Sequence, residues 1–182
     1  GLYRLAKTIG KEAKIINDTT GIGIDKFLAE AKKCDEYNDA FITREEAKNY
    51  VKENSLLIVV DTNKKNYVEA PELLEKVSRI VVVDHHRRST DYIENAILTF
   101  HEVYASSASE LVTEILEYSQ VKVELKSIEM EALYAGIMLD TKEFTFKTGV
   151  RTFEAAAYLR RCGVDIIKVK KWFQSDLKTY QT

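Results

Sequence analysis

Two uninterrupted apolar runs in this chain each end abruptly in polar residues. The first run, residues 56–60, leads into Asp61. The second run, residues 80–83, leads into one carboxylate and two imidazole side chains, those of Asp84, His85 and His86. Runs of Val, Ile and Leu without polar alternation are typical of parallel strands that are covered on both faces. We therefore expect two buried parallel strands whose carboxyl ends carry these polar groups.

The pattern around these runs predicts strands and helices in alternation. A short strand over residues 13–17 precedes helical segments near residues 25–33 and after Thr43, which forms a capping-box pattern with Glu46. A short helix is expected after Pro71, before the second apolar run. This alternation indicates an α/β fold with a parallel sheet built of βαβ units.

The second half of the chain has helical periodicity. Ser107 and Glu110 repeat the capping-box pattern and open a helix through about residue 118. Three more helices are expected, over residues 127–139, 151–161 and 168 to the end. One proline and seven glycines leave little room for a flexible linker. We therefore expect one domain over residues 1–182, with a parallel-sheet core and a helical C-terminal half.

Composition and charge exclude some classes of partner. The formal net charge of −2 provides no global basic field, so we expect no binding of long nucleic acid. No apolar run of about 18 residues is present, so we expect no membrane contact by this segment. Cys34 and Cys162 are far apart in sequence and form no CxxC pattern. Two reduced thiols of a reducing compartment are the simplest interpretation.

Asp61 and the Asp84-His85-His86 cluster indicate a metal or phosphate site. Chemistry in open α/β sheets gathers at the carboxyl ends of the strands, where both polar groups are expected. A neutral imidazole binds metal, and a protonated one donates a proton to a leaving oxygen. A mixed Asp/His set without thiolate suits Mn²⁺ and similar ions better than a structural zinc site. An exposed turn after the strand is the alternative interpretation of the histidine pair.

Three further groups could join such a site. Asp140 follows an apolar helix at the end where the helix dipole disfavours negative charge, so a metal or solvent exposure would stabilise it. Ser106 and Ser107 stand at a helix start, where backbone N–H groups bind an anion or are simply capped. Arg87 and Arg88 follow the histidines and either clamp phosphate oxygens or are solvated.

Together these motifs resemble the DHH phosphoesterase superfamily. Asp84-His85-His86 is its signature, residues 60–63 are similar to its second motif, and residues 138–141 are similar to its fourth. Three further segments have amino-acid sequences similar to those in the DHH domain of the membrane-anchored cyclic-di-AMP phosphodiesterases of Gram-positive bacteria. They are residues 83–88, 105–110 and 148–156. The resemblance covers nearly the whole chain.

The resemblance implies a role for each site residue. Asp61 would bridge two ions, usually manganese, and His85 and Asp140 would complete the shell of one of them. His86 would contact the scissile phosphate or assist the leaving group, and Asp84 would orient a histidine from outside the metal shell. The implied reaction is hydrolysis of the cyclic dinucleotide cyclic-di-AMP to linear pApA.

The resemblance also implies what surrounds this segment. The first motif of the family, a histidine followed by a DxD pair, would lie upstream of Gly1, and the substrate-binding subdomain would follow Thr182. Without them, the chain is expected to bind at most one ion well and to hydrolyse the substrate poorly or not at all. The parent protein would be anchored in the bacterial cell membrane with this domain in the cytoplasm, and a homodimer is compatible with that arrangement.

Three alternatives stay open. Other members of the superfamily degrade short oligonucleotides, phosphoadenosine phosphate or pyrophosphate, and the core motifs do not separate these substrates. A signalling receiver would use Asp61 as a phosphate acceptor, but it gives His85 and His86 no role. A binding-only module, degenerate or truncated, is the third, although the retained Asp61, His85 and Asp140 argue against degeneracy.

Overall fold

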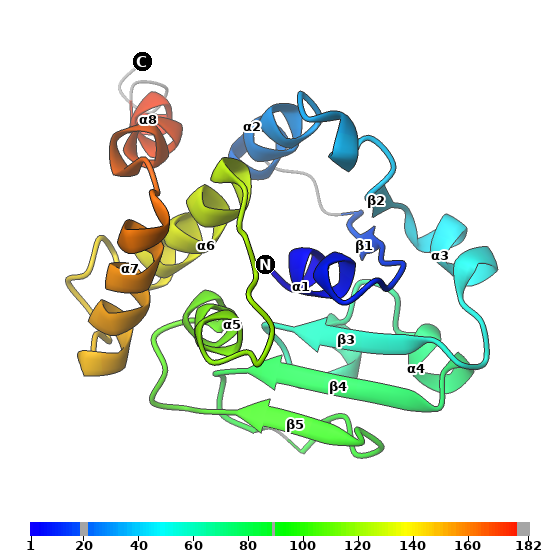
Figure 1. Ribbon diagram of the computed structural model, residues 1–182. Helices are drawn as coiled ribbons and strands as arrows, with labels where there is room; N and C mark the ends of the chain where they lie inside the picture. Colours follow the sequence, from blue (N-terminus) through cyan, green and yellow to red (C-terminus); the bar gives the residue numbers. More distant parts are fainter. Residues whose placement is uncertain (19–21, 89, 178–182) are drawn as a thin grey trace.

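The computed structural model describes residues 1–18, 22–88 and 90–177 and has an α/β fold (Figure 1). Its main sheet has three parallel strands, β3 (Leu56–Val60), β4 (Arg79–Asp84) and β5 (Leu98–His101). The central strand is β4, with Val83 opposite Val60 on one side and Asp84 opposite His101 on the other. All three strands end at the same edge of the sheet (Figure 1), which is where open α/β sheets bind ligands.

The N-terminal part adds a second, smaller sheet. It consists of the parallel pair β1 (Ile15–Ile16) and β2 (Phe41–Ile42). The helices of this part are α1 (Leu2–Thr8), α2 (Ile22–Ala31), η1 (Asp35–Tyr37) and α3 (Arg44–Tyr50). Between β3 and β4 the chain forms η2 (Lys65–Tyr67) and α4 (Leu73–Lys76). The predicted alternation of parallel strands and helices is confirmed, but among the described residues the strands form two sheets rather than one.

The C-terminal half is helical, as expected. It contains α5 (Ala108–Glu117), α6 (Ser127–Asp140), α7 (Val150–Cys162) and α8 (Ile166–Leu177). α5 packs against β4 and against both α6 and α7, so Val83 shares one apolar core with these helices. A Cβ atom on Gly136 would lie only 2.0 Å from Ser109 Oγ. Glycine therefore lets α6 approach α5 closely, and this packing determines where the end of α6 lies.

The two predicted capping boxes have different outcomes. At α3, Thr43 and Glu46 form the complete box. At α5, Ser107 Oγ accepts the Glu110 N–H at 3.0 Å, but the Glu110 carboxylate bonds to Ser106 instead of returning to the Ser107 N–H. The second prediction is therefore only half right, because the Glu110 carboxylate binds Ser106, the residue before the N-cap.

The burial of the strands corrects a second prediction. β4 is buried on both faces, as its apolar run indicated. In β3, however, Leu56, Ile58 and Val60 are 51%, 38% and 39% exposed. These alternate residues share one face of β3, which is an edge strand of its sheet. An apolar run alone does not distinguish a central strand from an edge strand.

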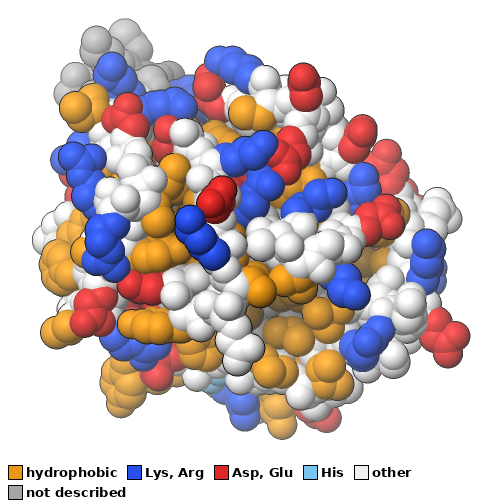
Figure 2. All heavy atoms as spheres, in the orientation of Figure 1, with side chains coloured by type: hydrophobic (Ala, Val, Ile, Leu, Met, Phe, Trp, Pro, Cys, Tyr) orange, Lys and Arg blue, Asp and Glu red, His pale blue; other side chains and the backbone are white. Residues whose placement is uncertain are grey.

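Charges are mixed over the surface. On the face shown in Figure 2, Lys and Arg side chains alternate with Asp and Glu side chains, with apolar side chains between them. Among the helices of the described ranges, none has the length and apolar character that crossing a bilayer requires. Cys34 and Cys162 are free and exposed.

Candidate metal centre

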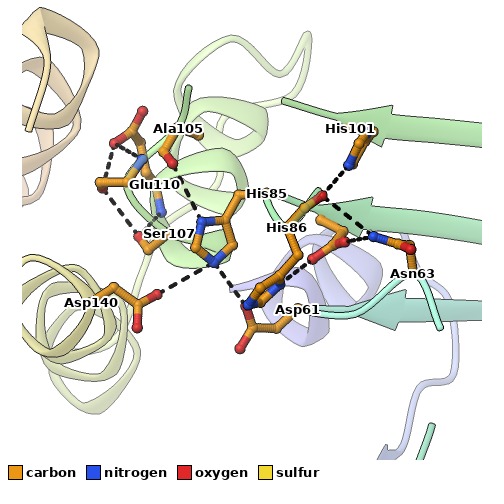
Figure 3. A network of polar contacts seen from close by, with 11 residues as sticks. Asp61, Asn63, His85, His86, His101, Ala105, Ser107, Glu110 and Asp140 are labelled. Atoms are coloured by element: carbon orange, nitrogen blue, oxygen red, sulfur yellow. Dashed lines mark hydrogen bonds and ion pairs between the residues drawn. The ribbon is translucent and has the colours of Figure 1, made fainter. Parts of the chain in front are cut away.

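The structure brings the strand-end residues together with the end of α6. Asp61, His85 and His86 each offer a ligand atom within 4.8 Å of the others. Asp140, the last residue of α6, places its Oδ2 3.7 Å from His85 Nε2. The four side chains converge in Figure 3, although they come from two strand ends and a helix separated in sequence.

Asp61 has an unusual backbone conformation. Its φ is +68°, in the left-handed region that non-glycine residues rarely adopt. Its N–H still continues the sheet by donating to Val83 O at 3.0 Å. The chain therefore turns sharply at this residue, directly after β3. Strained backbone of this kind is concentrated at functional sites, where it sets the direction of a side chain.

The contacts of His85 fix the roles of its two ring nitrogens. Nδ1 lies 3.3 Å from Ala105 O, which can only accept, so Nδ1 carries a hydrogen. Nε2 points to two carboxylates, 3.3 Å from Asp61 Oδ1 and 3.7 Å from Asp140 Oδ2 (Figure 3). A bare lone pair would be repelled there, so Nε2 needs either a proton or a cation.

Electrostatics support this conclusion. The hydrogen bond with Asp61 raises the pKa of His85, against the opposing effect of burial. Burial raises the pKa of Asp140, and the nearby negative charge of Asp61 raises it further. A positive charge between these three groups would offset the repulsion between the two carboxylates.

The donor set fits a divalent cation. Asp61 and Asp140 supply oxygens, and His85 supplies a nitrogen whose opposite ring N–H is bound to a backbone carbonyl. A carbonyl in that position is the usual way in which proteins orient a metal-binding imidazole. Oxygen and imidazole ligands without thiolate suit Mn²⁺ and related ions.

His86 is oriented by a different partner. Its Nδ1 lies 2.8 Å from Asp84 Oδ1, and Asp84 is fully buried. The other carboxylate oxygen of Asp84 accepts a hydrogen bond from Asn63 Nδ2 at 2.5 Å. Burial alone would raise the pKa of Asp84, but these two hydrogen bonds outweigh it and lower the pKa. With Nδ1 engaged, Nε2 is the nitrogen that His86 can present to a ligand.

Two residues of this arrangement were missed in the sequence. Asn63 Nδ2 is also 3.4 Å from His86 O, so its amide contacts both Asp84 and the backbone of His86. A ring nitrogen of His101 contacts the same carbonyl. The signal for His101 was its place at the end of a third strand, where the parallel register puts it opposite Asp84. Asn63 lies two residues after Asp61, inside the second motif.

The residues expected to contact phosphate have varied surroundings. Ser106 and Ser107 are buried, and their hydroxyl groups bond within the start of α5. Arg87 is exposed, and the guanidinium of Arg88 lies 4.9 Å from the ring centroid of Tyr92. Arg88 also lines a cavity of about 240 Å³ beside Asn63 and His101. Contact of these four residues with phosphate stays a prediction.

Comparison with known proteins places this chain in one family. Residues 2–137 match the model of the DHH family, N-terminal domain. The chain belongs to the DHH family. The resemblance stated from the sequence is thereby confirmed.

Individual relatives give finer detail. The chain is similar to the cyclic-di-AMP phosphodiesterase GdpP of Bacillus subtilis, with 41% identity over 99% of this chain and 28% of the relative. A more distant relative is the probable bifunctional oligoribonuclease and PAP phosphatase NrnA of Streptococcus mutans, with 30% identity over 68% of this chain and 38% of the relative. The chain thus spans little more than a quarter of the length of GdpP.

A solved structure shares the fold. The exopolyphosphatase-related protein from Bacteroides fragilis superposes with a TM-score of 0.74 over 94% of this chain and 49% of that chain. The sequence identity is 17%, so this likeness establishes the fold alone. It confirms the predicted α/β architecture with parallel strands.

Proposed function

We propose that this chain is the catalytic DHH domain of a metal-dependent phosphodiesterase that hydrolyses cyclic-di-AMP to linear pApA. The observation that carries the proposal is the position of His85 Nε2, which points to Asp61 and Asp140 at 3.3 and 3.7 Å. The similarity to GdpP supports the choice of substrate. Residues 1–182 would then be one domain of a longer, membrane-anchored protein, with its substrate in the cytoplasm.

Three residues would hold the cation. Asp61, His85 and Asp140 face one another and carry the oxygen and nitrogen donors that suit Mn²⁺. The family resemblance implies that Asp61, whose carboxylate is exposed, would bridge two ions in the complete site. When bound, such ions supply positive charge to the phosphate oxygens and to the attacking water.

His86 would assist the departure of the leaving oxygen. Its Nδ1–H donates to Asp84, so Nε2 is free to carry the proton that the leaving oxygen needs. The low pKa of Asp84 keeps its carboxylate charged beside the imidazole, so that it continues to accept the hydrogen bond from Nδ1. Water would attack phosphorus and release one proton to solvent, the bond from phosphorus to O3′ would break, and the proton of His86 would pass to O3′. His86 would then regain a proton from solvent.

Positively charged side chains near the histidines would orient the substrate. Arg87 and Arg88 directly follow His86, and Arg87 is exposed. Guanidinium groups bind phosphate oxygens in a bidentate manner. Of the two serines at the α5 start, Ser107 would contribute through its backbone, since both hydroxyl groups and the N–H of Ser106 already have partners.

Product analysis tests the proposal. The full-length protein with Mn²⁺ is incubated with cyclic-di-AMP, and the products are separated by chromatography. We expect linear pApA to accumulate, and His86→Ala to abolish its formation. Intact cyclic-di-AMP after prolonged incubation would contradict the proposal.

A second candidate is hydrolysis of short oligonucleotides or phosphoadenosine phosphate. The observation in its favour is the similarity to NrnA. The same assay separates the two candidates when pApA and phosphoadenosine phosphate are offered as substrates. Consumption of these without cleavage of cyclic-di-AMP would favour the second candidate.

A further inference from the structure

A buried carboxylate lies behind the metal centre and is not used by the proposed reaction. Glu110 Oε2 accepts three hydrogen bonds, from Ser106 N at 3.1 Å, Ser106 Oγ at 2.5 Å and Thr152 Oγ1 at 2.6 Å. Glu110 and Thr152 are each 1% exposed, and Ser106 is fully buried. Carboxylates are rarely buried to this extent, because desolvation destabilises them unless hydrogen bonds compensate.

The cap of α5 does not require this carboxylate. Ser107 Oγ already accepts the Glu110 N–H and so satisfies the start of the helix. The Glu110 side chain instead bonds to Ser106, which precedes the helix. It therefore stabilises the segment that leads from β5 into α5.

That segment carries the acceptor for His85. Ala105 O lies 3.3 Å from His85 Nδ1, and Ala105 O and Ser106 N belong to the same planar peptide group. In a trans peptide the C=O and N–H point in opposite directions, so His85 and Glu110 bind opposite sides of one peptide plane. Figure 3 shows Ala105 between the His85 ring and the Glu110 cluster. A bond that fixes the Ser106 N–H therefore also fixes the direction of the Ala105 carbonyl.

Thr152 links this peptide to α7. Its hydroxyl group donates to Glu110 at 2.6 Å and accepts the Gly149 N–H at 3.1 Å. The first turn of α7 thereby holds the carboxylate. The chain of contacts runs from Thr152 through Glu110 and the peptide group to the ring of His85.

We propose that Glu110, held by Thr152, is a positioning residue that sets the orientation of His85 through the Ala105–Ser106 peptide group and thereby sets the affinity for a divalent cation. The cation part rests on the proposed function. The positioning part does not, because it concerns the metal-free chain.

Thr152→Val tests the proposal, since it removes the hydroxyl donor and keeps the side-chain shape. Ring ¹⁵N–¹H correlation spectra of the metal-free chain report His85 directly, because the chain has only three histidines. Mn²⁺ affinity is measured by titration. We expect the His85 ring signals to shift and the Kd for Mn²⁺ to rise about threefold to tenfold, less than for loss of a direct ligand partner. Thr152→Ser keeps the hydroxyl and should restore both.

Thr113→Val is the matched control. Thr113 is fully buried in α5, and its hydroxyl group donates to Ser109 O at 2.7 Å, away from the Ala105–Ser106 peptide. We expect it to change neither readout. Glu110→Gln gives a second test if Thr152→Val does not fold, because a neutral acceptor weakens the same bonds and should shift both readouts in the same direction.

The outcomes separate the two proposals. Unchanged His85 signals in Thr152→Val, or an equal shift in Thr113→Val, would overturn the positioning role. If the parent chain binds no Mn²⁺, the metal part of the proposed function fails, while the His85 signals of the metal-free variants still decide the positioning role.

Discussion

Asp84 and His86 form a hydrogen-bonded pair in which the carboxylate is fully buried and the imidazole is half exposed, with 2.8 Å between Oδ1 and Nδ1. The hydrogen bond holds Nδ1 of His86 in place and leaves Nε2 free for chemistry. Asn63 completes it by donating to the second oxygen of Asp84. A histidine held in this way presents one defined nitrogen to a ligand.

Asp84→Asn should disturb this pair without changing the size of the side chain. An amide can donate to Nδ1 and so stabilise the opposite tautomer, a neutral ring with its hydrogen on the exposed Nε2, which is a much weaker acid than the imidazolium. We expect kcat of the full-length protein to fall about 100-fold or more, with a smaller change in KM. Steady-state kinetics on cyclic-di-AMP provide the measurement. The exposed Asp91, in the segment between β4 and β5, gives the control Asp91→Asn, which should keep normal kcat. Equal kcat for both variants would contradict the role of the pair.

Gly136→Ala should destabilise the fold because of the contact between α5 and α6. The added Cβ would lie 2.0 Å from Ser109 Oγ and 2.9 Å from Ser109 Cβ. We expect the free energy of unfolding to fall by about 1–3 kcal/mol, as for other overpacked contacts. Urea denaturation measures it. Adding Ser109→Gly removes both contacting atoms and should recover part of the loss; no recovery would show that the clash is not the cause.

The stability of the chain should depend on pH through Glu36. Its pKa is lowered to about 2, first by the hydrogen bond from Arg4 and then by the one from Lys126. A carboxylate with a depressed pKa stabilises the folded state fully above its unfolded pKa of 4.5, and this contribution disappears as the pH falls through about 2. Glu36→Gln should therefore be less stable than the parent at pH 6, and the difference should shrink between pH 4.5 and 2. Thermal unfolding of both chains over this range is the test, and a difference that stays constant with pH would contradict it.

The strand ends of the site could be predicted from the sequence. Asp61 directly follows one apolar run, Asp84 and His85 follow the other, and parallel strands bring such positions to one edge of the sheet. This expectation depends on local periodicity and on one general rule of α/β folds. The relation of Asp84 to a histidine was expected only from the family resemblance.

Other features depend on tertiary packing and could not be predicted in this way. Asp140 reaches His85 because Gly136 allows α6 to approach α5, and no local pattern specifies that distance. The bond from Glu110 to Ser106 departs from the capping box that the spacing indicated, because Thr152 of a distant helix also binds the carboxylate. The exposed face of β3 was missed because an apolar run does not show whether a strand lies at an edge.

Binding of Mn²⁺ to the 182-residue chain tests the metal centre most directly. Electron paramagnetic resonance measures free Mn²⁺ during titration of the parent chain, His85→Ala, Asp140→Asn and the control Asp91→Asn. We expect the parent and the control to bind one ion, because Asp61, His85 and Asp140 face a single position. Both site variants should lose about tenfold or more in affinity. Unchanged Mn²⁺ binding in His85→Ala and Asp140→Asn would contradict the assignment of this cluster as a metal centre.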